Sequence, residues 1–277
     1  MKVLSNVVQR YKYFGKYQSF CEKSCTFAPE INDMEQLIYR IALFVTGIIN
    51  ILMAGMLLQG SKSYKQYAVY FRTRMLTTLW VGVFGLAYIL HGILMWRYTW
   101  PTAASALTVT YFHIGAICFS WGYTTLLNPH YLTPRIVLRD GIYYLACLLL
   151  YWMVPLLWKE QPAFTLLSYC LYFAYAAWIV FKFYKTYNKV STRLLRLSYG
   201  NVMDFVRWMQ VCCDLIVLFG ICSVVITGVF PTDFWPYTLL LIAGVGMFGF
   251  ICYSLNKYGA TIETATEATR KVTRKRL

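Results

Sequence analysis

The chain has 277 residues, of which 59% are hydrophobic and only 13% are charged. A soluble globular domain carries about 25% charged residues, so the composition excludes an ordinary soluble protein and indicates a fold whose solvent is lipid. The formal net charge of +15 would favour a nucleic-acid partner if the basic residues shared one surface, but they lie in loops between apolar runs. We therefore expect the lipid bilayer as the surrounding partner, and no direct binding of nucleic acid.

The segment 1–33 precedes the first apolar run and contains five Lys and Arg residues. Its first 20 residues hold no apolar stretch of seven or more, a pattern that does not match a cleaved signal peptide. We expect either an N-terminal arm or, if translation begins at Met34, an extension that is absent from the native protein.

Seven apolar segments follow, each close to the length of roughly 17 to 25 residues that spans a bilayer as a helix. They run approximately over Leu37–Leu58, Met75–Trp96, Ala103–Leu127, Gly141–Trp158, Phe164–Phe181, Trp208–Phe230 and Tyr237–Leu255. The sequence predicts an all-α membrane protein, with a bundle of about seven transmembrane helices in residues 34–255 and a short basic cytoplasmic tail in residues 256–277.

The orientation follows from the distribution of basic residues. Eighteen Lys and Arg residues lie in every second loop and in the tail, whereas the intervening loops contain only Arg97 and Lys159. Cytoplasmic loops of membrane proteins are enriched in Lys and Arg, so we expect the N-terminus outside and the C-terminus inside the cell.

Two stretches resemble a known family. Residues 96–140 read WRYTWPTAASALTVTYFHIGAICFSWGYTTLLNPHYLTPRIVLRD, and residues 183–200 read FYKTYNKVSTRLLRLSYG. Both resemble bacterial multi-pass membrane modules that precede AraC-type helix-turn-helix regulators or histidine kinases. The resemblance implies a sensor in signal transduction, located in the bacterial cytoplasmic membrane. Only 22 residues follow Leu255, so we expect a module without its effector domain or a fragment of a longer product.

Three ionisable residues fall inside the predicted membrane helices: His91, His113 and Asp214. Such residues are costly in lipid and are candidates for function. They could form a polar track between helices with a proton-sensitive imidazole at its centre. Alternatively, each histidine donates a hydrogen bond that simply packs two helices together.

Other patterns carry less weight. Gly244, Gly246 and Gly249 spell GxGxxG, but this run lies within an apolar helix rather than after a strand, so we interpret it as a packing face.

We find no nucleophile with a base, no paired carboxylates and no zinc-ligand spacing, and we expect neither enzymatic activity nor a cofactor. The leading hypothesis is a signal-sensing or signal-relaying module that acts with a cytoplasmic partner or as a homodimer. The alternative is a small-solute transporter or channel.

Overall fold

The computed structural model describes residues 28–157, 162–198, 204–230 and 233–274, and every regular element in these ranges is helical. Seven of the described helices contain segments that are long and apolar enough to cross a bilayer. This confirms the all-helical fold expected from the sequence, and the seven helices fit a multi-pass membrane protein. Residues 1–27, which contain most of the expected N-terminal arm, lie outside the described part of the chain.

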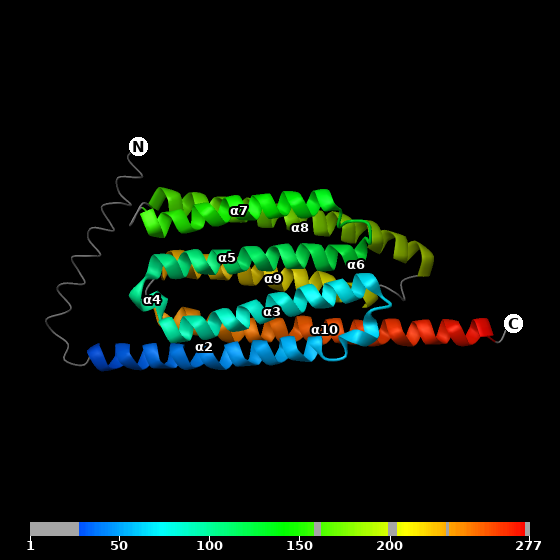
Figure 1. Ribbon diagram of the computed structural model, residues 1–277, viewed down its shortest axis with the longest axis horizontal. Helices are drawn as coiled ribbons and strands as arrows, with labels where there is room; N and C mark the ends of the chain where they lie inside the picture. The colour runs from blue at the N-terminus through cyan, green and yellow to red at the C-terminus, as the bar shows by residue number, and fades with distance from the viewer. Residues whose placement is uncertain (1–27, 158–161, 199–203, 231–232, 275–277) are drawn as a thin grey trace.

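The long helices are α2 (Ala28–Leu58), α3 (Ala68–Leu94), α5 (Pro101–Phe119), α7 (Pro134–Leu157), α8 (Pro162–Ser198), α9 (Asp204–Val229) and α10 (Phe234–Arg274). Short elements join them: η1 (Ser61–Tyr64), α4 (Trp96–Thr99), the π-helical turn η2 (Ser120–Thr124) and α6 (Thr125–Leu127). The helices lie side by side, with α2, α3 and α10 on one side, α7 and α8 on the other, and α5 and α9 between them (Figure 1).

Two helices continue well past the apolar runs that predicted them. The run ending at Phe181 becomes a helix that ends at Ser198, and the run ending at Leu255 becomes a helix that ends at Arg274. A helix satisfies its backbone groups internally whether or not its side chains are apolar, so it need not stop where the bilayer ends. As a result, α10 projects beyond the rest of the bundle (Figure 1).

The distribution of side chains is that of a protein surrounded by lipid. Helix α2 turns an apolar stripe outward at three- and four-residue spacing, with side chains between 49% and 63% exposed: Met34, Leu37, Ile41, Val45, Ile48, Leu52 and Met56. Polar side chains such as Thr73, Arg74 and His113 are instead buried between helices. An exposed apolar stripe of this length would be a liability in water, whereas in lipid it is the expected surface.

Helices α2 and α3 approach each other most closely where two glycines face each other. A Cβ atom on Gly85 would lie 2.9 Å from the carbonyl oxygen of Gly47, and one on Gly47 would lie 2.9 Å from the carbonyl oxygen of Gly85. Small residues allow helix backbones to pack this closely in a membrane. By contrast, Gly55 on α2 has open space where its Cβ would be.

The two ends of the bundle can be told apart by the turn that carries Arg97 and by the projecting part of α10. The turn between α3 and α5, which carries Arg97, lies at one end, here called the Arg97 end. Helix α10 begins there and projects from the opposite end, here called the tail end (Figure 1).

Candidate functional site: a cationic pocket at the Arg97 end

A tight reversal of the backbone positions Arg97. Helix α3 ends at Leu94, and the next residue, Met95, has a φ of 47° and is the one non-glycine residue with positive φ in the described ranges. The Met95 amide donates to the His91 carbonyl oxygen at 2.8 Å, and α4 begins at the next residue. Pro101 then starts α5 at a helix position that tolerates proline. The left-handed residue folds the single turn of α4 back over the end of the bundle.

The side chain of Arg97 is buried, with only 4% of its surface exposed. Its guanidinium carbon lies 3.5 Å from the centre of the Tyr237 ring on α10, and one terminal nitrogen donates to Thr108 Oγ1 at 3.4 Å. The Nε and Nη1 nitrogens, which carry three of the five N–H groups, have no hydrogen-bond partner among the described residues.

Five helices line a small cavity beside this guanidinium. Its walls are Tyr39, Leu43, Phe84, Tyr88, His91, Arg97, Thr108, Tyr111, Phe112, Tyr237, Leu240 and Leu241, and it encloses about 50 Å³. One water needs about 10–15 Å³, so the cavity has room for a group of a few non-hydrogen atoms. The Tyr237 hydroxyl is also buried and without a described partner.

The charge of Arg97 is not balanced by a neighbouring carboxylate. Within the described residues, the one ion pair is Arg139 with Asp140, on a different helix. Removing a cation from water costs several kcal/mol unless an opposite charge or good hydrogen bonds compensate. A ring face supplies part of this compensation through a cation–π contact. Unpaired N–H donors beside an apolar cavity are therefore chemically suited to bind a small anion.

A second buried arginine lies towards the tail end and joins three helices. Arg74 on α3 donates to the Leu57 carbonyl oxygen at 2.6 Å, to Asn256 Oδ1 at 2.6 Å and to the Tyr70 hydroxyl at 3.0 Å. The Tyr70 hydroxyl in turn donates to the Leu255 carbonyl oxygen at 2.9 Å. We call this group the Arg74 junction. It holds α10 against the end of α2, where the last helical carbonyls attract a cation.

The structure places the three residues predicted from the sequence at separate positions. His91 lines the cationic pocket, with its ring 6.4 Å from the ring of Tyr111. His113 is completely buried between α5, α7 and α8, where Tyr151 hydrogen-bonds its Nδ1 atom at 3.3 Å. Five tyrosine rings, here called the aromatic cage, have centres between 4.6 and 6.2 Å from the centre of the His113 ring: Tyr143, Tyr144, Tyr151, Tyr172 and Tyr175.

Asp214 is exposed on α9, and its Oδ1 atom accepts a hydrogen bond from the Tyr184 hydroxyl on α8. The Nε2 atom of His113 has no hydrogen-bond partner in the described ranges, so Asp214 is not paired with that imidazole. The polar track of three residues is therefore not assembled in this arrangement. His91 is the member that lies in a cavity, and Arg97 is the pocket residue that the sequence analysis assigned to a loop.

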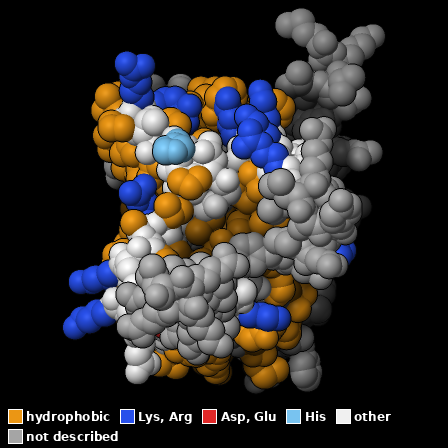
Figure 2. Space-filling model, turned by 90° about the vertical axis from the view of Figure 1, so that its right-hand side faces the viewer, with side chains coloured by type: hydrophobic (Ala, Val, Ile, Leu, Met, Phe, Trp, Pro, Cys, Tyr) orange, Lys and Arg blue, Asp and Glu red, His pale blue; other side chains and the backbone are white. Residues whose placement is uncertain are grey.

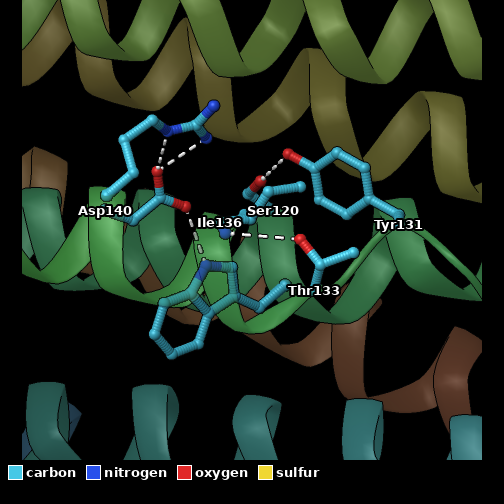
Figure 3. A network of polar contacts seen from close by, with 7 residues as sticks. Ser120, Tyr131, Thr133, Ile136 and Asp140 are labelled. Atoms are coloured by element: carbon cyan, nitrogen blue, oxygen red, sulfur yellow. Dashed lines mark hydrogen bonds and ion pairs between the residues drawn. The ribbon is translucent and has the colours of Figure 1, made fainter.

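A further polar network connects the π-helical turn to α7. Asp140, which is 1% exposed, accepts a hydrogen bond from Trp121 Nε1 at 2.9 Å and two from Arg139 at 2.9 and 2.7 Å. Ser120 and Tyr131 form a hydrogen bond nearby, as Figure 3 shows. This network fixes the start of α7, and the sequence analysis did not identify it.

In the described part of the chain, no three His, Cys, Asp or Glu side chains are grouped closely enough to hold a metal ion. Comparison with known protein families, with curated proteins and with solved structures finds no match for this chain.

One signal in the sequence could have indicated the pocket. Arg97 is the sole Lys, Arg, Asp or Glu residue between Leu94 and Arg135. Three aromatic residues lie beside it in the sequence: Trp96, Tyr98 and Trp100. An isolated arginine with aromatic neighbours suits a buried cation–π contact better than a solvated loop.

Proposed function

We propose that this protein is a signal-sensing membrane module that binds a small anion beside Arg97 and relays binding through α10. The buried guanidinium, which has no carboxylate partner among the described residues, carries the proposal, because an anion would supply the opposite charge and the acceptors that its Nε and Nη1 groups lack. The size of the cavity, about 50 Å³, favours a carboxylate or a similarly small anion. No catalytic step is part of the proposal.

The geometry of α10 supports the relay. Tyr237, Leu240 and Leu241 near its start line the pocket, and Leu255 and Asn256 near its middle belong to the Arg74 junction. The helix then continues to Arg274. An anion that draws the guanidinium away from the Tyr237 ring would change the packing of one end of a helix whose other end projects from the bundle. Small shifts of whole helices are an established way of transmitting binding.

The proposed orientation places the pocket outside the cell and the tail of α10 in the cytoplasm. The described Lys and Arg residues of the loops and helix ends are concentrated at the tail end: Lys62, Lys65, Arg72, Arg74, Arg135, Arg139, Lys182, Lys185, Lys189, Arg193, Arg207 and Lys257. Arg40 and Arg97 lie at the other end. This asymmetry supports an inward-facing tail end. The resemblance to sensor modules supports a bacterial cytoplasmic membrane, with a cytoplasmic signalling protein or a second copy as the partner.

Binding to the purified full-length protein tests the sensing step. We expect formate or acetate to raise the midpoint of thermal unfolding in detergent, and we expect Arg97→Gln to abolish the rise. Arg40→Gln is the matched control, because Arg40 is a cation at the same end that is exposed and donates to the Gly92 carbonyl oxygen at 3.0 Å. Equal responses of the two variants would contradict an anion site at Arg97.

Hydrogen exchange tests the relay and separates it from the alternative, a small-anion transporter. If binding is relayed, the anion changes the rate of amide hydrogen exchange in residues 256–263 of α10, and it does so only when Arg97 is present. A transporter would instead give saturable, Arg97-dependent uptake of the anion into proteoliposomes. Such uptake, without a change in exchange along α10, would overturn the relay.

A further inference from the structure

We infer that a second site, a basic cleft near the tail end, binds a phosphate-bearing anion. The cleft lies between α8 and the connection from α6 to α7, has a volume of about 620 Å³, and does not depend on the Arg97 pocket. Its lining residues are Leu127, Asn128, Pro129, His130, Tyr131, Ile136, Arg139, Lys182, Lys185, Thr186, Lys189, Val190 and Arg193. Figure 2 views this end of the molecule and shows Lys and Arg side chains gathered on it.

Four of the cations come from one face of α8. Lys182, Lys185, Lys189 and Arg193 are spaced by three, four and four residues, so successive side chains project in nearly the same direction from a helix with 3.6 residues per turn. Placing like charges at this spacing is unfavourable without a counter-charge. The arrangement therefore suits an anion that contacts several of these residues at once.

The fifth cation, Arg139, reaches the cleft from the opposite wall. Its guanidinium carbon lies 5.9 Å from the centre of the Trp178 ring, and the Lys182 Nζ atom lies 4.5 Å from the same ring. The two cations on different helices thus converge on one aromatic side chain. Asp140 holds Arg139 in this position through Nε and Nη2, as the network in Figure 3 shows.

Asp140 neutralises Arg139 through their ion pair, but the four cations of α8 have no carboxylate among the residues that line the cleft. None of its lining residues is Asp or Glu, and the nearby Asp140 is 1% exposed and already accepts from Trp121 and Arg139. A phosphate group offers several acceptor oxygens and a full negative charge, which match several Lys and Arg donors better than one carboxylate does.

The position of the cleft indicates two sources for the phosphate. The apolar run of α8 ends at Phe181, directly before Lys182, so the cleft lies where the headgroups of a bilayer are expected. Basic pockets between transmembrane helices are known to take anionic headgroups. Apolar wall residues such as Leu127, Ile136 and Val190 would suit the rest of a lipid. A soluble phosphate compound entering from the aqueous side would use the same cations.

The test compares two double variants of the full-length protein, each lacking two positive charges at the tail end. Lys185→Gln with Lys189→Gln removes exposed cations from the cleft, whereas Lys62→Gln with Lys65→Gln removes exposed cations outside it. Thermal unfolding in uncharged detergent is followed while short-chain phosphatidylglycerol, short-chain phosphatidylcholine or inorganic pyrophosphate is added.

We expect phosphatidylglycerol, but not phosphatidylcholine, to raise the unfolding midpoint of the wild type and of the Lys62/Lys65 variant. For the Lys185/Lys189 variant, the lipid concentration needed should be about tenfold higher or more. A response to pyrophosphate that also requires Lys185 and Lys189 would identify a soluble phosphate compound as a ligand. The inference is overturned if both double variants respond like the wild type to every addition, or if both lose the response equally.

Discussion

The Arg97 guanidinium lies over the Tyr237 ring, with 3.5 Å between the guanidinium carbon and the ring centre. The two residues are 140 positions apart in the sequence and belong to α4 and α10. A cation–π contact in a desolvated site contributes about 2 kcal/mol. This contact therefore joins the turn after α3 to the start of the helix that leaves the bundle.

The contact predicts that two substitutions of Tyr237 differ in their effect on stability. Tyr237→Leu removes the ring and should lower the free energy of unfolding by about 2 kcal/mol in the absence of any added anion. Tyr237→Phe keeps the ring and removes a buried hydroxyl that has no described partner, so it should leave stability nearly unchanged. Unfolding by denaturing detergent, followed by tryptophan fluorescence, measures both. Equal losses would mean that the hydroxyl, not the ring face, supports Arg97.

The glycine contact between α2 and α3 makes a second prediction. A Cβ on Gly85 would lie 2.8 Å from Ile51 Cγ1, in addition to its approach to the Gly47 carbonyl. Gly85→Ala should therefore force the helices apart and cost about 1–3 kcal/mol. Gly55→Ala, where the new methyl group meets open space, serves as the control and should cost little. A stable Gly85→Ala variant would show that this helix pair can separate without loss.

The Arg74 junction predicts a local effect on α10. Arg74→Met removes every hydrogen bond from the guanidinium and should destabilise the protein by about 3 kcal/mol, because several bonds to a charged group are lost together. Lys257, which is exposed just after the junction, should then be cut faster by trypsin. Asn256→Leu removes one of those bonds and should give a smaller increase. Unchanged cleavage in both variants would mean that α10 is held elsewhere.

The aromatic cage predicts coupling between His113 and Tyr151. His113→Leu leaves the buried Tyr151 hydroxyl without its partner, at a cost of about 1–3 kcal/mol, and Tyr151→Phe removes the partner of Nδ1. The double variant should lose less than the sum of the two single variants. Additive losses in a double-mutant cycle would show that the 3.3 Å contact contributes nothing to stability.

The sequence predicted the helices well because each must present a long apolar run to lipid, and such runs can be counted. It did not predict how each helix is rotated about its own axis. His113 and Asp214 could be assigned a depth in the membrane, but the structure turns one towards the tyrosines of α7 and α8 and the other towards the outer surface. The depth of a side chain in the membrane follows from its position along one helix, whereas the direction in which it points depends on how all the neighbouring helices pack.

The cationic pocket was missed for a related reason. Counting basic residues per loop treats every arginine between helices as solvated, which holds for most of them. Arg97 is an exception because Met95 adopts a left-handed conformation and folds the next turn inwards. No local preference for that conformation is evident in methionine, which lacks the freedom of glycine. Packing of the whole bundle end, rather than the local sequence, maintains it.

Helix α10 has the proportions of a lever whose fulcrum is the Arg74 junction. At 1.5 Å per residue, the arm from Tyr237 to Asn256 is about 29 Å long, and the arm from Asn256 to Arg274 is about 27 Å long. With nearly equal arms, a sideways displacement of the pocket end reappears at the far tip at almost the same size and in the opposite direction. A displacement at the pocket that accommodates one small anion would thus move the C-terminal end of α10 by about the same distance, where a partner protein could detect it.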